Sequence, residues 1–166
     1  MADTDFTLTK DYLHQIFDYK DGELYWKINK ASVKIGQKAG TLDRQNNRLQ
    51  IQINNKFYKV HRIIFMMFYG YFPKEIDHED GNPANNKIEN LRDSTSSQNN
   101  YNQRLRKDNT SGVKGVSWDK QSRKWKARCW VNKKMHLIGF FDNIEQAADA
   151  MKSARIELHG NFARHN

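Results

Sequence analysis

The stretch that decides the fold prediction is residues 76–100, IDHEDGNPANNKIENLRDSTSSQNN. Its turn-rich run 79–86 separates two short segments, at 75–76 and 88–91, which we predict to be strands. The serine and threonine at 94–95 are suited to cap a helix that follows them. The stretch therefore predicts the order strand, loop, strand and helix.

Three side chains in this stretch are suited to the hydrolysis of a phosphodiester bond. His78 has the resting pKa of a base that could activate water near neutrality. Asp77 offers a hard carboxylate oxygen of the kind that Mg²⁺ prefers, and Asn99 could add an amide oxygen from the predicted helix. Neighbouring strand residues point to opposite faces, so Asp77 and His78 need a bend to converge. The combination predicts a metal-dependent nuclease centre; the alternative is a loop in which these residues only build turns.

The polar residues of this region follow a recognisable order. Before them lies Val60-His61-Arg62, which leads into an apolar segment that we predict to be a helix over 61–69. The residues of the central stretch itself are Asp77-His78, Gly81-Asn82, Asn86, Asn90-Leu91 and Asn99. Over residues 57–103 this pattern resembles the HNH nucleases, and within them the branch found in phage homing endonucleases.

The resemblance implies a ββα-metal fold and assigns roles by position. His78 matches the general base, and Asp77 and Asn99 match the two protein ligands of the metal. Asn90 matches the asparagine that braces the loop between the strands and so orients the histidine. The implied cofactor is one divalent cation per active site, Mg²⁺ or else Mn²⁺. We expect no zinc, because a single cysteine cannot build a cysteine-bound zinc site.

The C-terminal part of the chain has a pattern of its own. Apolar alternation predicts three strands, over 113–119, 125–131 and 135–141, and Asn143 is placed to cap a helix whose apolar residues follow helical spacing. Small residues on one side of the middle strand would let this helix lie close to the sheet. We therefore predict a three-stranded antiparallel sheet packed on one helix.

Five short motifs carry a second resemblance, to the AP2 domain, over residues 109–163. They are GVKGVSW (112–118), KWKAR (124–128), IGFFD (138–142), EQAA (145–148) and ELHG (157–160). The AP2 family reads DNA with the exposed face of its sheet. By alternation we expect seven residues to share that face: Lys114, Trp118, Lys126, Arg128, Trp130, Lys134 and His136. Core packing is the alternative for the tryptophans, and lysines in place of arginines argue against strict base-specific readout.

The remaining elements complete an α+β fold class. We predict a helix over 10–17, a hairpin over 19–26 with its turn at Asp21-Gly22, and paired strands over 49–53 and 56–60. The polar segment 106–111 is the expected linker. It would join an HNH nuclease domain at 1–105 to an AP2-like DNA-binding domain at 112–166.

Composition is consistent with a nucleic-acid partner. The chain of 166 residues has 28 basic and 19 acidic side chains, a net charge of +9. Residues 106–166 hold 13 of the basic side chains and 6 of the acidic ones, so the surplus is concentrated in the C-terminal part. A solvated basic surface is the plainer alternative. The polar N-terminus lacks a signal-peptide pattern, and no apolar run is long enough to span a membrane, so we expect a cytoplasmic protein of a bacterium or a phage-infected bacterial cell.

Together these observations predict a metal-dependent endonuclease of the HNH homing type that hydrolyses double-stranded DNA. One such centre would nick one strand, so we expect a monomer, or a dimer on DNA where both strands are cut. The main alternative is a non-catalytic, sequence-specific DNA-binding regulator that uses the AP2-like sheet. An RNA-binding protein is a third possibility.

Overall fold

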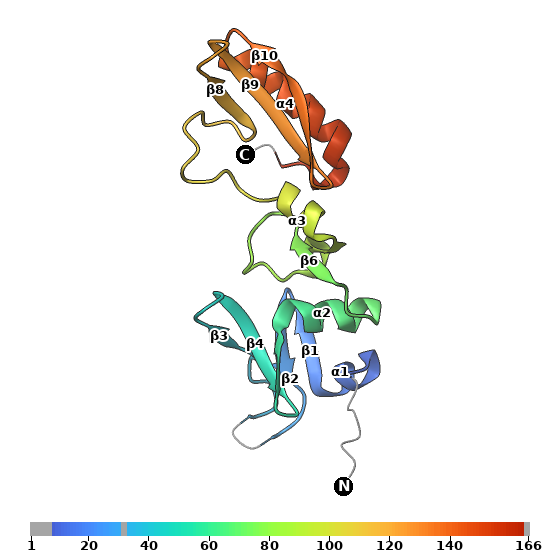
Figure 1. Ribbon diagram of the computed structural model, residues 1–166. Coiled ribbons are helices and arrows are strands. Elements are labelled where there is room, and N and C mark those ends of the chain that lie inside the picture. The colour runs from blue at the N-terminus through green and yellow to red at the C-terminus, as the bar shows by residue number, and fades with distance from the viewer. Residues whose placement is uncertain (1–7, 31–32, 165–166) are drawn as a thin grey trace. The chain divides into compact units, whose positions relative to one another are not determined.

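The structure is a computed structural model that describes residues 8–30 and 33–164. The chain divides into two compact units, Met1–Asp93 and Ser94–Asn166, whose elements are shown in Figure 1. This structural division falls before the expected linker at 106–111, which becomes part of the second unit. The assignment of 1–105 and 112–166 as functional domains stays a prediction.

The first unit begins with a helix and a hairpin, both as predicted. The elements are α1 (Lys10–Ile16), β1 (Phe17–Lys20) and β2 (Glu23–Trp26). The Thr9 side chain caps α1 by accepting a hydrogen bond from the Tyr12 N–H at 3.2 Å. Asp21 and Gly22 both have positive φ, 51° and 87°, as a tight two-residue hairpin turn requires.

A three-stranded antiparallel sheet in the order β3-β4-β5 follows. Its strands are β3 (Thr41–Asp43), β4 (Arg48–Ile53) and β5 (Lys56–Lys59). The β4–β5 hairpin was predicted, and its turn has positive φ at Asn54 and Asn55. Strand β3 was not predicted, because its three residues have no apolar alternation and none of them is buried.

Helix α2 (Val60–Tyr69) lies at the centre of the first core. Ile63, Ile64 and Met67 are fully buried on it. Gly70 ends the helix in the left-handed region, at φ 79°, and its N–H donates to the Met66 carbonyl at 2.9 Å. The buried residues of α1, β2, β4 and α2 form one continuous cluster, which supports the segment that follows.

The predicted order of strand, loop, strand and helix is present with one change. The elements are β6 (Glu75–His78), the 3-10 helix η1 (Ile88–Asn90), β7 (Leu91–Ser94) and α3 (Ser96–Tyr101). The second strand begins at Leu91 rather than at 88, because residues 88–90 form a helical turn closed by the Asn90 N–H on the Lys87 carbonyl at 2.9 Å. Strands β6 and β7 form a two-stranded sheet. Thr95 caps α3, with a reciprocal capping box to Gln98.

The second unit contains a three-stranded antiparallel sheet in the order β10-β9-β8. Its elements are β8 (Val116–Asp119), β9 (Lys124–Val131), β10 (Lys134–Phe141), α4 (Ile144–His159) and the 3-10 helix η2 (Gly160–Phe162). Ala127 and Cys129 of β9 form the core with Ala147 and Met151 of α4, as the small residues of the middle strand predicted.

Strand β8 starts three residues later than expected. The segment before it turns at Gly115, which has φ 84°, so Val113 packs beside the core without belonging to the strand. The whole is a mixed α/β fold with several small antiparallel sheets. In the described part of the chain, no helix has the length and apolar character needed to cross a membrane.

Candidate functional site

Asp77 and His78 end strand β6, and both are buried, with 3% and 5% of their surface exposed. The preceding Ile76 packs in the first core, which fixes the strand against α2. The two side chains have different partners. Asp77 binds Arg92 of β7, whereas His78 lies against Asn86 of the loop and His61 of α2. Burial and separate partners give each side chain a defined orientation.

The Asp77 carboxylate is bound by a guanidinium group. Arg92 places its Nε 2.8 Å and one terminal nitrogen 2.7 Å from the same oxygen, Oδ2. Glu79 lies 3.8 Å from the other terminal nitrogen of Arg92. A buried carboxylate needs such a partner, because desolvation of an unpaired charge costs several kcal/mol. Sequence reasoning did not identify Arg92; its place directly after Asn90-Leu91, on the strand that pairs with β6, was the available signal.

His78 is held by an amide and lies beside a second histidine. Its Nε2 is 3.1 Å from Asn86 Oδ1. Its ring meets that of His61 edge to face, with centroids 5.3 Å apart. Burial lowers the pKa of His78 below its ordinary value, although the bond to Asn86 acts in the opposite direction. Burial also lowers the pKa of His61 from 6.5 to about 3, helped by the nearby Arg48. Both imidazoles are therefore neutral at pH 7.

Asn90 binds the loop between β6 and β7 through its side chain. Its Oδ1 accepts from the Asp80 N–H at 2.9 Å. Its Nδ2 donates to Asp80 Oδ1 at 3.0 Å and to the Asn85 carbonyl at 2.8 Å. The Asp80 carboxylate also accepts from the Asn82 N–H at 2.7 Å. These bonds brace the loop, and Asn86, which reaches His78, follows Asn85 directly.

Asn99 lies on α3, in the second unit, where its N–H donates to the Thr95 carbonyl at 2.9 Å. Asp77, His78 and Asn90 lie in the first unit, so a metal site shared by Asp77 and Asn99 stays a prediction. Among the described residues, no group of three or more His, Cys, Asp or Glu side chains could hold a metal ion. A set of one carboxylate and one amide oxygen does fit a hard cation such as Mg²⁺, which keeps several waters.

The exposed face of the C-terminal sheet follows from the strand register. Residues directly opposite in an antiparallel pair project to the same face. Lys126 is paired with Phe140, Arg128 with Leu137, and Trp130 with Met135. We call these six residues the exposed sheet face. Trp130 is 56% exposed and Leu137 51%, so this face is apolar as well as basic.

Three of the predicted contact residues do not belong to the exposed sheet face. His136 is paired with Cys129 and Lys134 with Val131, which places both with the residues on the helix side. Trp118 is paired with Trp125 and meets it edge to face, with ring centroids 5.2 Å apart. The prediction that these residues share a face with Arg128 and Trp130 is therefore wrong, because alternation was extended across strands without their register.

Lys114 is also misplaced by the prediction. It precedes β8, and its ammonium group donates to the carbonyls of Tyr101 at 2.9 Å and Gln103 at 2.6 Å. Burial, together with the nearby positive charge of Arg155, lowers its pKa from 10.5 to about 8. The half-buried Lys114 side chain thus points toward the end of α3 rather than along the sheet.

Two comparisons with known proteins concern the region that contains these residues. A family model described as HNH endonuclease matches residues 58–101. Protein 3.8 of Escherichia phage T7 is 41% identical over 95 residues, which cover 57% of this chain and 75% of that protein. No solved structure matches the chain. The chain therefore belongs to the family of the phage T7 Protein 3.8, and it carries an HNH endonuclease-type domain at residues 58–101.

Proposed function

We propose that the protein is a metal-dependent DNA endonuclease of the HNH homing type that hydrolyses a phosphodiester bond in double-stranded DNA. The observation that carries this proposal is the buried, neutral His78 at the end of β6, held by Asn86 beside a loop that Asn90 braces. Its position inside the HNH endonuclease match supports the same reading.

His78 has the properties of a general base. An amide oxygen only accepts hydrogen bonds, so the contact with Asn86 Oδ1 places the imidazole proton on Nε2. The lone pair is then on Nδ1, which is the atom that would take a proton from the attacking water. Because burial lowers the pKa of His78, the ring holds this basic form at pH 7.

Asn90 and Asn86 are positioning residues in this proposal. Asn90 binds the loop at Asp80 and Asn85, and the next residue, Asn86, orients the His78 ring. Loss of the brace would release the loop and with it the ring. Preorganisation of this kind matters because a base must be held within hydrogen-bond reach of its water in the transition state.

Asp77 and Asn99 would hold one divalent cation, Mg²⁺ or Mn²⁺, which when bound neutralises charge on the phosphate and the leaving oxygen. Arg92 orients the Asp77 carboxylate through its two contacts with Oδ2. When no cation is bound, Arg92 also balances the charge of the buried carboxylate. The donor set contains no thiolate, so we do not propose zinc.

The exposed sheet face of the second unit would bind the duplex. Arg128 and Lys126 can contact phosphates or base edges, and Trp130 adds an exposed aromatic ring on the same face. This is the arrangement that the AP2 resemblance implies, now limited to residues whose register places them together. One centre of this kind cuts one strand per engagement, so a monomer would nick and two copies would be needed for a double-strand break.

The test is cleavage of DNA by the purified protein. We expect Mg²⁺-dependent conversion of supercoiled plasmid carrying phage DNA inserts to the open-circular form, and its loss with EDTA. His78→Ala should reduce the rate about 10²-fold or more while DNA affinity stays unchanged. Gln15→Ala is the control, since Gln15 is an exposed residue of α1 outside the candidate site. DNA binding without metal-dependent cleavage would instead favour the non-catalytic regulator.

A further inference from the structure

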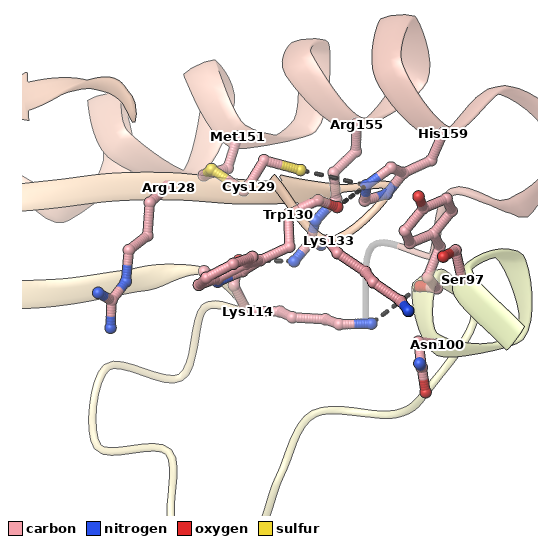
Figure 2. A pocket seen from close by; sticks show the side chains of 12 residues that line it. Ser97, Asn100, Lys114, Arg128, Cys129, Trp130, Lys133, Met151, Arg155 and His159 are labelled. Carbon is pink, nitrogen blue, oxygen red and sulfur yellow. Dashed lines mark hydrogen bonds between the residues drawn. The ribbon is translucent and has the colours of Figure 1, made fainter. Parts of the chain in front are cut away.

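The second unit contains a pocket of about 310 Å³ between α3 and the sheet module. Its walls come from α3, the segment before β8, strand β9, the β9–β10 turn and α4, as Figure 2 shows. Helix α3 is fixed to this wall. The Tyr101 ring stacks on His159 with centroids 3.8 Å apart, and its hydroxyl accepts from the Asn132 N–H at 2.8 Å.

The pocket is positively charged. Its cations are Lys114, Arg128, Lys133 and Arg155, and none of the described residues that line it carries a carboxylate. Arg155 is only 4% exposed, yet its guanidinium binds carbonyls, those of Lys114 at 2.6 Å and Arg164 at 2.8 Å. In the described ranges, none of the four cations forms a salt bridge. Lys133 and Arg128 are exposed, whereas Arg155 is buried and Lys114 half-buried. Because positive charge removed from water without a counter-charge is costly, an anion bound beside Arg155 and Lys114 would be favoured.

The donors of the pocket suit a phosphate group. In Figure 2 the Lys114 and Lys133 side chains extend toward α3, where Ser97 and Asn100 also line the pocket. Lys114 gives two of its three N–H groups to the Tyr101 and Gln103 carbonyls, which leaves one for a ligand. With the Lys133 ammonium, a hydroxyl and an amide, it can donate to the oxygens of one phosphate. The pocket is also continuous with the exposed sheet face, because Arg128 and Trp130 belong to both.

We propose that this pocket binds one phosphodiester group of the DNA backbone, with Lys114 and Lys133 as its charged donors. This proposal rests on duplex DNA being the substrate, as proposed above. It assigns Lys114 a role that differs from the sheet-face contact predicted from sequence. Because Asn100 lines the pocket and Asn99 is the preceding residue of α3, the bound phosphate would anchor the strand to the helix that carries the proposed metal ligand.

The experiment compares Lys133→Gln with the matched control Lys152→Gln in duplex binding, with EDTA present so that no cleavage occurs. Lys133 lies in an exposed turn, so its substitution leaves the core intact, and Lys152 is exposed on α4 outside the pocket. We expect Lys133→Gln to weaken binding to all duplex sequences by about 2- to 10-fold. It should also reduce the slope of log affinity against log salt by about 0.9, whereas Lys152→Gln changes neither quantity.

Two further measurements test whether DNA binds in the pocket itself. NMR spectra of the full-length protein should show shifts of the Asn100 and Lys133 amides when a short duplex is added. Inorganic phosphate is the second probe, and it should compete with the duplex only at far higher concentration. If inorganic phosphate occupies the pocket but DNA does not shift either amide, the proposal that the pocket binds the DNA backbone is overturned.

The proposal would also be overturned if Lys133→Gln left the salt dependence of binding unchanged, or if Lys152→Gln lost as much duplex affinity as Lys133→Gln. These outcomes leave the proposed nuclease function standing, since they concern binding without cleavage. Conversely, a wild-type protein that binds DNA through this pocket but never cuts it would contradict the nuclease function alone.

Discussion

Arg92 donates to Asp77 through two nitrogens that converge on one carboxylate oxygen, at 2.8 Å and 2.7 Å. Both partners are largely removed from water, with side-chain exposures of 19% for Arg92 and 4% for Asp77. This pair joins the two strands of the β6–β7 sheet directly beside His78. Breaking a buried pair of this kind costs more stability than breaking a surface ion pair.

Replacing Arg92 tests this pair. Arg92→Ala would leave the Asp77 carboxylate buried without its cation, so we expect the free energy of unfolding to fall by about 3 kcal/mol. Arg92→Lys keeps the charge but loses the planar fork, so an intermediate loss is expected. The measurement is chemical denaturation at pH 7, with Arg44→Ala, a change at an arginine in an exposed turn, as the control. A loss no greater than that of the control would show that the pair contributes little.

The buried His61 predicts a pH dependence of stability. Its pKa is about 3 in the folded chain and 6.5 ordinarily, so between these values the unfolded state binds the additional proton. Stability should therefore fall as the pH drops below about 6.5, by up to about 1.4 kcal/mol per pH unit from this group. His78, whose pKa is also lowered, adds to the same trend.

His61→Gln isolates the first contribution. The variant should show a pH slope of unfolding free energy that is smaller by about one proton between pH 4 and 6. Gln15→Ala, a change at an exposed residue of α1 that does not titrate, should keep the wild-type slope. Denaturation followed by NMR signals of Leu13 and Ile63, both in the first core, reports on the correct unit. Equal slopes in all three proteins would mean that His61 titrates normally.

The strand register predicts opposite results for two lysines. Lys126 lies on the exposed sheet face beside Phe140, with its ammonium 5.6 Å from the ring centroid, whereas Lys134 lies with the helix side. Lys126→Gln should lower duplex affinity and reduce the salt slope by about one, and Lys134→Gln should change neither. Fluorescence anisotropy over a series of salt concentrations measures both. If Lys134→Gln lowered duplex affinity and Lys126→Gln did not, the duplex would bind another side of the second unit.

Gly115 should not tolerate a side chain. Its φ of 84° is in the left-handed region, and an added Cβ would lie 2.6 Å from the Arg128 carbonyl oxygen and 2.8 Å from Met151 Cε. Gly115→Ala should therefore destabilise the second unit by about 2 kcal/mol or more. Gly112→Ala is the matched control: its φ is also positive, at 72°, but no atom lies within 4 Å of an added Cβ. Thermal unfolding of the two variants separates collision from backbone strain.

Much of the local structure could be predicted from sequence because short-range chemistry determines it. The helix cap at Thr9, the turn at Asp21-Gly22, the stop at Gly70 and the cap at Thr95 all act within a few residues. Residues 88–90 were predicted as part of a strand but form a helical turn. This error is also local, because a helical turn and a brief strand have similar apolar content. For the candidate site, residue order predicted Asp77, His78, Asn90 and Asn99 and placed Asn86 in the same pattern. It did not indicate that Asn86 contacts His78 or that Arg92 binds Asp77.

What the sequence alone determined was therefore the order of elements, the HNH-like set of polar residues and the basic C-terminal module. Only the tertiary structure brought Arg92 to Asp77, His61 to His78 and Tyr101 to His159, because these contacts join segments that meet only when the chain packs. The faces of the C-terminal sheet also depend on tertiary structure. Alternation within one strand is local, but the short turn after Val131 pairs it with Lys134, and that register decides which residues of β9 and β10 share a face.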